Sequence, residues 1–158
     1  MKVLTVFTSK YGSSGMYASR LADEFGDGSQ AVDVKQAKKM DLDQWEGIIV
    51  GGGIYMGKTP RGLKSFLKKH LNALKNKQIG LFVCCASKAE DSRITEYFEK
   101  NFPFELVEKA VFKRVFPGGQ MMNEKAGFMY KKMYDQMAKL PKEEIDDLIR
   151  DSVKEYLL

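Results

Sequence analysis

No apolar run in the chain approaches the ~20 residues that a helix needs to cross a bilayer. The segment from Met1 to Phe7 is too short for a signal peptide and is more typical of a first β-strand. Together these absences predict a cytoplasmic protein. A length of 158 residues, with 44% hydrophobic and 30% charged residues, predicts one globular domain over 1–158.

Cysteine and histidine are scarce, which limits the disulfides, metal sites and catalytic groups that the chain can form. The only cysteines, Cys84 and Cys85, are adjacent, and a disulfide between neighbours strains the peptide that joins them. We therefore predict reduced, buried thiols, with a redox role for one of them as the alternative. The only histidine, His70, is expected at the end of the third helix, in a surface or capping role rather than in catalysis. The sequence has no pattern typical of a metal site or a nucleophilic triad.

Asp and Glu are missing from residues 47–89, a segment that instead holds many basic side chains. These are Lys58, Arg61, Lys64, Lys68, Lys69, Lys75, Lys77 and Lys88. With a formal charge of +5 for the whole chain, this basicity suits an acidic partner, an anionic membrane surface or nucleic acid.

The helix expected over 59–74 separates its charged and apolar residues. Its basic side holds Arg61, Lys64, Lys68 and Lys75, and its apolar side holds Leu63, Phe66, Leu67 and Leu74. The simpler interpretation is the solvated face of an amphipathic helix. The functional alternative is a docking patch for an acidic partner or for an anionic membrane, with peripheral contact at the inner membrane face. We expect no nucleic-acid partner, and the oligomeric state stays open.

Strand-like and helix-like segments alternate along the chain. This pattern predicts an α/β fold with a doubly wound, five-stranded parallel sheet and an extended C-terminal helical segment. The strands are expected over 2–8, 31–34, 47–52, 79–85 and within 106–116. The helices are expected over 13–25, 59–74 and 91–102, with a helical turn or loop at 41–43. Apolar residues at helical spacing after the fifth strand predict two helices, or one helix kinked at Pro141.

Two glycine-containing loops follow strands whose ends should carry the ligand site. The first, residues 8–14 (Thr-Ser-Lys-Tyr-Gly-Ser-Ser), joins a strand to a helix. Exposed backbone N–H groups, hydroxyls and a helix N-terminus favour a bound phosphate, and Gly12 permits the tight turn. The alternative is an ordinary strand-to-helix turn with a serine N-cap.

The second loop, residues 51–59, contains a literal P-loop match. Residues 52–59 fit G-x-x-x-x-G-K-T, the nucleotide-binding pattern. However, no other strand ends in the Asp that a P-loop NTPase needs for magnesium. Pro60 and the bulky pair Tyr55 and Met56 also suit a phosphate cradle poorly. We predict that the match is accidental and keep a P-loop nucleotide-binding protein as the remote alternative.

Three segments carry a resemblance to a known family. Residues 9–12 (Ser-Lys-Tyr-Gly) resemble the phosphate loop of flavodoxin-like domains. Residues 51–57 (Gly-Gly-Gly-Ile-Tyr-Met-Gly), followed by 66–70 (Phe-Leu-Lys-Lys-His), resemble one branch of that superfamily, which includes bacterial quinone-dependent protoporphyrinogen oxidases. Residues 116–119 (Phe-Pro-Gly-Gly), before a Met- and Tyr-rich segment, are also similar to that branch. The resemblance covers essentially the whole chain.

The resemblance implies a flavodoxin-like fold that binds FMN. The residues implied to hold the ribityl phosphate are Ser9, Lys10, Tyr11, Gly12, Ser13 and Ser14. Those implied to line the isoalloxazine are Gly53, Ile54, Tyr55, Met56 and Gly57. The turn after the fourth strand would touch the other side of the ring through Cys85, Ala86, Ser87 and Lys88.

The chain also departs from the family pattern. Tyr11 stands where a typical flavodoxin has threonine, and residues 86–88 offer no aromatic ring to stack on the flavin. One flavin face would therefore be open to a substrate or partner. Trp45 does not fill this gap, because it precedes the third strand and so should pack near the opposite end of the sheet.

In such a protein FMN supplies the chemistry, while the chain sets its position and electrostatics. The resemblance implies a redox protein that passes electrons between partners, with a quinone-linked, protoporphyrinogen-oxidase-like dehydrogenase as the alternative. The methionines at 121, 122, 129, 133 and 137 fill the core or, alternatively, form an apolar wall for a quinone or porphyrin. Lys58 and Lys88 would stabilise the reduced flavin anion, which favours a higher-potential carrier or a quinone-linked enzyme over a low-potential shuttle.

Overall fold

A five-stranded, all-parallel sheet with the order β2-β1-β3-β4-β5 forms the centre of the protein. The computed structural model describes residues 1–85, 93–118, 127–128 and 140–158. The strands are β1 (Val3–Thr8), β2 (Gln30–Asp33), β3 (Gly47–Gly53), β4 (Gln78–Cys85) and β5 (Phe112–Pro117). The doubly wound architecture predicted from the alternating pattern is confirmed.

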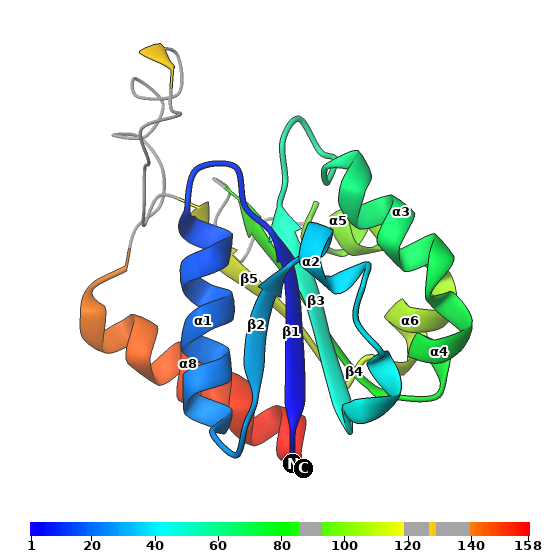
Figure 1. The fold of residues 1–158 in the computed structure, drawn as a ribbon. Helices are drawn as coiled ribbons and strands as arrows, with labels where there is room; N and C mark the ends of the chain where they lie inside the picture. Colours follow the sequence, from blue (N-terminus) through cyan, green and yellow to red (C-terminus); the bar gives the residue numbers. More distant parts are fainter. Residues whose placement is uncertain (86–92, 119–126, 129–139) are drawn as a thin grey trace.

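Helices cover both faces of the sheet (Figure 1). One face carries α1 (Ser13–Phe25) and α8 (Lys142–Leu157). The other carries α2 (Val34–Ala37), α3 (Arg61–Lys69), α4 (Leu71–Lys75), α5 (Ile94–Asn101) and α6 (Phe104–Lys109), and a 3₁₀ turn, η1 (Leu42–Gln44), precedes β3. Within the described ranges, no helix combines the length and the apolar character that crossing a membrane requires.

Each strand sends alternate side chains to two separate cores, as the two-residue period of a strand requires. Leu4 and Val6 of β1 pack in the core beneath α3, whereas Val3 packs in the core beneath α1 and α8. The second core also receives Tyr156 of α8, whose hydroxyl donates to the Gln78 carbonyl at 2.7 Å. Because Tyr156 is buried, its pKa is raised, so its phenol stays a neutral donor.

Proline marks two helix starts that the sequence placed differently or did not predict. The helix expected over 59–74 begins only at Arg61, because Pro60 is its extended N-cap, and it is interrupted at His70 between α3 and α4. Residues 104–109 form α6 after Pro103, a helix that the sequence did not predict, and β5 occupies the C-terminal part of the range 106–116 in which the fifth strand was expected, extending one residue past it to Pro117. A short segment dominated by a proline boundary gives little helical periodicity to detect.

Only part of the predicted C-terminal helical segment lies within the described residues. Helix α8 begins directly after Pro141, whose ψ of 156° is extended, so the helix boundary at this proline agrees with the sequence. Apart from residues 127–128 and 140, the helix predicted before Pro141 lies outside the described residues, and so do all five methionines from 121 to 137. The same holds for positions 91 and 92 at the start of the helix expected over 91–102.

The single tryptophan, the two cysteines and the single histidine all pack within the fold or cap a helix. Trp45 is buried before β3, as predicted, with the Lys2 ammonium 4.5 Å from its ring centroid. Cys84 and Cys85 are both buried, as predicted, and neither forms a disulfide in this structure. His70 caps α3 through its backbone N–H to the Phe66 carbonyl at 3.0 Å, and its ring packs on Phe66. Burial and the neighbouring Lys69 lower the pKa of His70.

Candidate functional site

The sheet places the two glycine-containing loops side by side. Strands β1 and β3 are neighbours and pair as far as Thr8 with Gly52, so the loop after each strand leaves from the same edge of the sheet. From there β1 continues into α1 on one face, while β3 leads to α3 on the other face. This is the topological switch point of a doubly wound sheet, where the crevice for a ligand opens.

The first loop has a backbone that only glycine adopts without strain. Gly12 has φ 115° and ψ −25°, and its N–H donates to the Ser9 hydroxyl at 3.2 Å. It precedes α1, whose first turn has no side-chain cap and no acidic residue. The first helical bond runs from the Met16 N–H to the Gly12 carbonyl, so the preceding N–H groups lack intrahelical acceptors. Uncapped N–H groups at the positive end of a helix dipole suit an anion.

The hydroxyls of the first helical turn have other roles than the sequence suggested. The Ser13 hydroxyl donates to the Gly118 carbonyl at 2.9 Å, and the Ser14 side chain hydrogen-bonds with Cys84. Burial raises the pKa of the Cys84 thiol to about 12, although the bond with Ser14 opposes this shift. Both serines are buried and connect α1 to the ends of β4 and β5. The main donors available to an anion at the start of this helix are therefore backbone N–H groups.

The three glycines at the end of β3 are required by packing. A Cβ at Gly51 would lie 2.3 Å from the Phe82 ring, and one at Gly52 would lie 2.2 Å from the Thr8 hydroxyl. A Cβ at Gly53 would lie 2.4 Å from the hydroxyl of Tyr55. The glycine run thus lets β1, β4 and the Tyr55 ring approach β3 closely, which accounts for it without a P-loop.

Residues 55–58 form a tight reverse turn. Tyr55 and Lys58 exchange both backbone hydrogen bonds, at 2.8 and 3.1 Å. The two central residues have positive φ, 53° at Met56 and 79° at Gly57, the backbone of a type I′ turn. The Lys58 N–H is consequently occupied, and the next helix begins only at Arg61. This is not the geometry of a phosphate cradle, in which free N–H groups lead directly into a helix.

Side chains of the two loops meet in front of the sheet edge. The rings of Tyr11 and Tyr55 lie edge to face, with centroids 6.1 Å apart. The Lys10 ammonium lies 5.2 Å from the Tyr11 centroid and 5.6 Å from that of Tyr55. The structure therefore brings together predicted phosphate-loop and ring-lining residues. Ile54 instead packs against the core beneath α3, and Met56 is fully exposed at the tip of the turn.

Thr8 begins the first predicted loop, but it was not among the residues assigned to the phosphate. It ends β1, its side chain is 7% exposed, and its hydroxyl has no hydrogen-bond partner within the described part of the chain. A buried hydroxyl without a partner is costly. A polar ligand in the crevice could satisfy it.

The turn after β4, predicted to contact the other side of the ring, is described only at its first residue, Cys85. Cys85 ends β4 opposite Pro117, and a Cβ on Gly118 would lie 3.2 Å from the Cys85 carbonyl carbon. Tyr17 of α1 donates to the Pro117 carbonyl at 3.0 Å and so holds this end of β5. Ala86, Ser87 and Lys88, predicted to contact the ring, lie outside the described residues.

Asn101, at the end of α5, is a residue that sequence reasoning missed. Its side-chain oxygen accepts from the Thr59 N–H at 2.9 Å. Its amide nitrogen donates to the Gly57 carbonyl at 3.0 Å and to the Tyr97 carbonyl at 2.8 Å. Asn101 is buried, and it fixes the chain on the C-terminal side of the 55–58 turn. The contact joins residues 42 positions apart, and no local pattern signals it.

The profile of the family described as "Flavodoxin domain" matches residues 4–147, and the chain belongs to this family. An NADPH-quinone reductase from P. pentosaceus has the same fold, with a TM-score of 0.59 and 16% identity over 100% of this chain and 98% of that one. A flavodoxin from the Archaea gives a TM-score of 0.56 at 16% identity, over 100% of both chains.

A flavodoxin from Fusobacterium nucleatum, solved with flavin mononucleotide bound, gives a TM-score of 0.54 at 16% identity, over 98% of this chain and 99% of that one. At these identities the neighbours show a shared fold. No curated protein matched the chain.

Proposed function

We propose that this protein binds FMN at the switch point and transfers electrons through it. The observation that carries the proposal is the pair of loops after β1 and β3, which meet there through Tyr11 and Tyr55 beside the uncapped start of α1. Membership of the flavodoxin family supports the same cofactor. So does the Fusobacterium nucleatum neighbour, which contains FMN.

In this proposal the residues of the first loop, Ser9 to Ser14, hold the phosphate. Gly12 supplies the turn, and the backbone N–H groups of the first turn of α1 supply the donors. Lys10 adds positive charge on the side facing Tyr11 and Tyr55. The hydroxyls of Ser13 and Ser14 orient the helix against β5 and β4.

The ring system is proposed to lie against residues 53–57, with the stretch from Cys85 to Lys88 on its other side. Tyr55 folds over Gly53 and offers an aromatic face. The chain supplies position, exclusion of water and charge, and FMN when bound supplies the capacity to accept and release electrons. The simplest test is whether the purified protein is yellow and whether heating releases FMN. A colourless protein that does not bind added FMN would contradict the proposal.

A quinone-linked dehydrogenase of the protoporphyrinogen-oxidase type is the second candidate. The observation that favours it is Met56, whose fully exposed side chain at the turn tip gives a flat apolar substrate a contact beside Tyr55. Porphyrin fluorescence measured with protoporphyrinogen and a quinone acceptor separates the two candidates. Turnover well above the protein-free rate supports the enzyme, and its absence in FMN-loaded protein supports the carrier.

Lys58→Ala is expected to leave nucleotide binding unaffected, because wild-type protein should bind no magnesium nucleotide at residues 52–59. The Lys58 N–H pairs with the Tyr55 carbonyl, so the loop lacks the donors of a P-loop. Isothermal titration with ATP or GTP and magnesium checks this in both proteins, with FMN content as the control for folding. Nucleotide binding that needs Lys58 would overturn the flavin assignment.

Asn101→Ala is expected to weaken FMN binding by about threefold, since loss of the side chain leaves the Thr59 N–H and the Gly57 carbonyl without their partner. The bound flavin should also show an altered visible circular dichroism spectrum, which a change in stability alone would not produce. Asn76→Ala is the matched control, because the side-chain amide of Asn76 donates to the Asn72 carbonyl in an exposed position. Equal FMN affinity and spectra in Asn101→Ala and Asn76→Ala would remove Asn101 from the site.

A further inference from the structure

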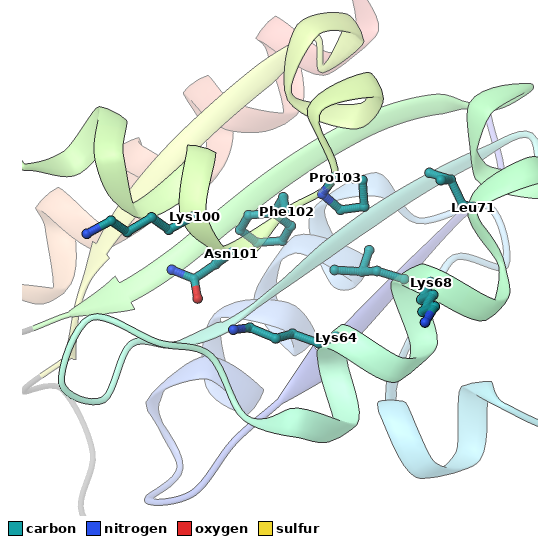
Figure 2. A pocket seen from close by; sticks show the side chains of 8 residues that line it. Lys64, Lys68, Leu71, Lys100, Asn101, Phe102 and Pro103 are labelled. Carbon is teal, nitrogen blue, oxygen red and sulfur yellow. The ribbon is translucent and has the colours of Figure 1, made fainter.

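A pocket of about 320 Å³ lies between α3–α4 and the corner that joins α5 to α6. Figure 2 shows Lys64, Lys68 and Leu71 on one side and Lys100, Asn101, Phe102 and Pro103 on the other. Leu67 completes the lining. The rim is therefore largely basic, and the interior is formed by leucine, phenylalanine and proline side chains.

The rim carries positive charge without a matching negative charge. In the part of the chain that the structure describes, no ion pair joins Lys64 or Lys68 to a carboxylate, and both lysines are exposed. Lys100 pairs with Glu96 on α5, so the excess charge lies on the α3 side. Arg61 at the start of α3 and Lys75 at the end of α4 are also exposed. By charge complementarity, this rim favours an acidic occupant.

The shape of the pocket favours a protein side chain over a membrane. A bilayer presents a broad surface and would leave a hollow between helices unfilled, whereas a partner can insert one apolar side chain into it. A pocket of 320 Å³ is close to the lower limit for small-molecule sites, and it has room for one aromatic ring. Carboxylates on either side of that ring would meet Lys64 and Lys68.

The pocket is connected to the candidate flavin site through Asn101. This residue lines the pocket, and it also bonds to Gly57 and Thr59 at the end of the turn proposed to line the ring. A partner seated in the pocket is thus separated from that turn by one side chain.

We propose that this pocket docks an acidic redox-partner protein, which inserts one apolar side chain between carboxylates that contact Lys64 and Lys68. The redox character of the partner rests on the proposed function, but the docking itself does not require the flavin. The helix predicted as a basic docking patch thus forms one side of this pocket, and residues 100–103 of α5 and of the corner before α6 form the other.

The test uses the full chain with its cofactor and two blocked pentapeptides. One has a central phenylalanine with two glutamates on each side, and the other has alanine at the centre. Fluorescence anisotropy of labelled peptides is expected to give at least about fivefold tighter binding for the phenylalanine peptide, because its ring is buried. Lys64→Glu/Lys68→Glu should weaken it at least about tenfold.

Two variants make the result specific. Leu71→Trp fills the pocket without changing charge and should abolish the preference for phenylalanine. Lys142→Glu/Lys154→Glu makes the same charge change on α8, on the other face of the sheet, and should change binding by less than about twofold. Far-UV circular dichroism establishes that each variant is folded, and the exposed lysine variants decide the question if Leu71→Trp does not fold.

Equal affinity for the two peptides, or equal losses in the α3 and α8 charge variants, would overturn the proposal. It would also be wrong if phosphatidylglycerol vesicles bound the protein through Lys64 and Lys68 while neither peptide bound, since the face would then be a membrane surface. FMN content, measured in parallel, keeps a failure of the flavin assignment distinct from a failure of docking.

Discussion

Gly12→Val is expected to weaken FMN binding at least ~10-fold, which corresponds to about 1.4 kcal/mol. Gly12 has φ 115°, a conformation that a β-branched residue does not adopt without strain. The valine must either distort the loop before α1 or place its side chain where the phosphate is expected to approach. Both outcomes displace the backbone donors of the first helical turn. Titration of apoprotein with FMN measures the loss.

Gly28→Val is the matched control for this effect. Gly28 also has positive φ, 79°, but it lies between α1 and β2 at the opposite end of the sheet, with only the flexible Lys2 side chain nearby. Both variants should lose stability, which thermal unfolding of the apoproteins measures, and only Gly12→Val should lose FMN affinity. Equal affinity in the two folded variants would remove the first loop from the site.

The sequence was most informative where a feature was local. Helix α1 has the predicted bounds, Ser13 to Phe25, because uninterrupted periodicity lies between Gly12 and Gly26. The five strands lie within a few residues of their predicted positions where apolar runs are bounded by turn residues. Their parallel pairing then places the ends of β1 and β3 together, which is why both loops could be assigned to one site.

The missed features depend on contacts between distant segments. Asn101 belongs to no motif, and its role appears only when α5 contacts the turn after β3. Thr8 begins the first loop, but the contact of its hydroxyl with Gly52 depends on the pairing of β1 with β3. The hydroxyl of Ser13 looked available in the sequence, but Gly118 lies close enough to accept its hydrogen. Periodicity reports which side of an element is buried, not which polar group of another element it meets.

The charge around the candidate site is mixed rather than purely basic. Lys10 and Lys58 belong to the two loops, which contain no carboxylate. Asp33 ends β2 at the same edge of the sheet, opposite Phe7, and its carboxylate accepts the Lys35 N–H at 2.8 Å. Reduction places negative charge on the flavin, so nearby lysines should favour the reduced anion and Asp33 should oppose it.

Removing Lys58 and Lys88 together is expected to lower the potential of the second one-electron reduction of bound FMN by tens of millivolts. A shift of about 59 mV is a tenfold change in a one-electron equilibrium, and the loss of two positive charges disfavours the reduced anion. Lys10 is left in place, because its loss would also affect the phosphate loop. Potentiometric titration of Lys58→Ala/Lys88→Ala against wild type measures the shift, and added salt should reduce it if the lysines are solvent-exposed.

Two further variants test whether the change in potential has the expected direction and whether it comes from charges near the flavin. Asp33→Asn keeps an N-cap side chain for α2 but removes a negative charge at the sheet edge, so the potential should rise. Lys142→Ala/Lys154→Ala removes two charges from α8 and should leave the potential nearly unchanged, since screening weakens distant charges. A low potential that is insensitive to Lys58→Ala/Lys88→Ala would show that these lysines do not tune the flavin. The protein would then be a plain low-potential electron shuttle, with its basic surface serving docking alone.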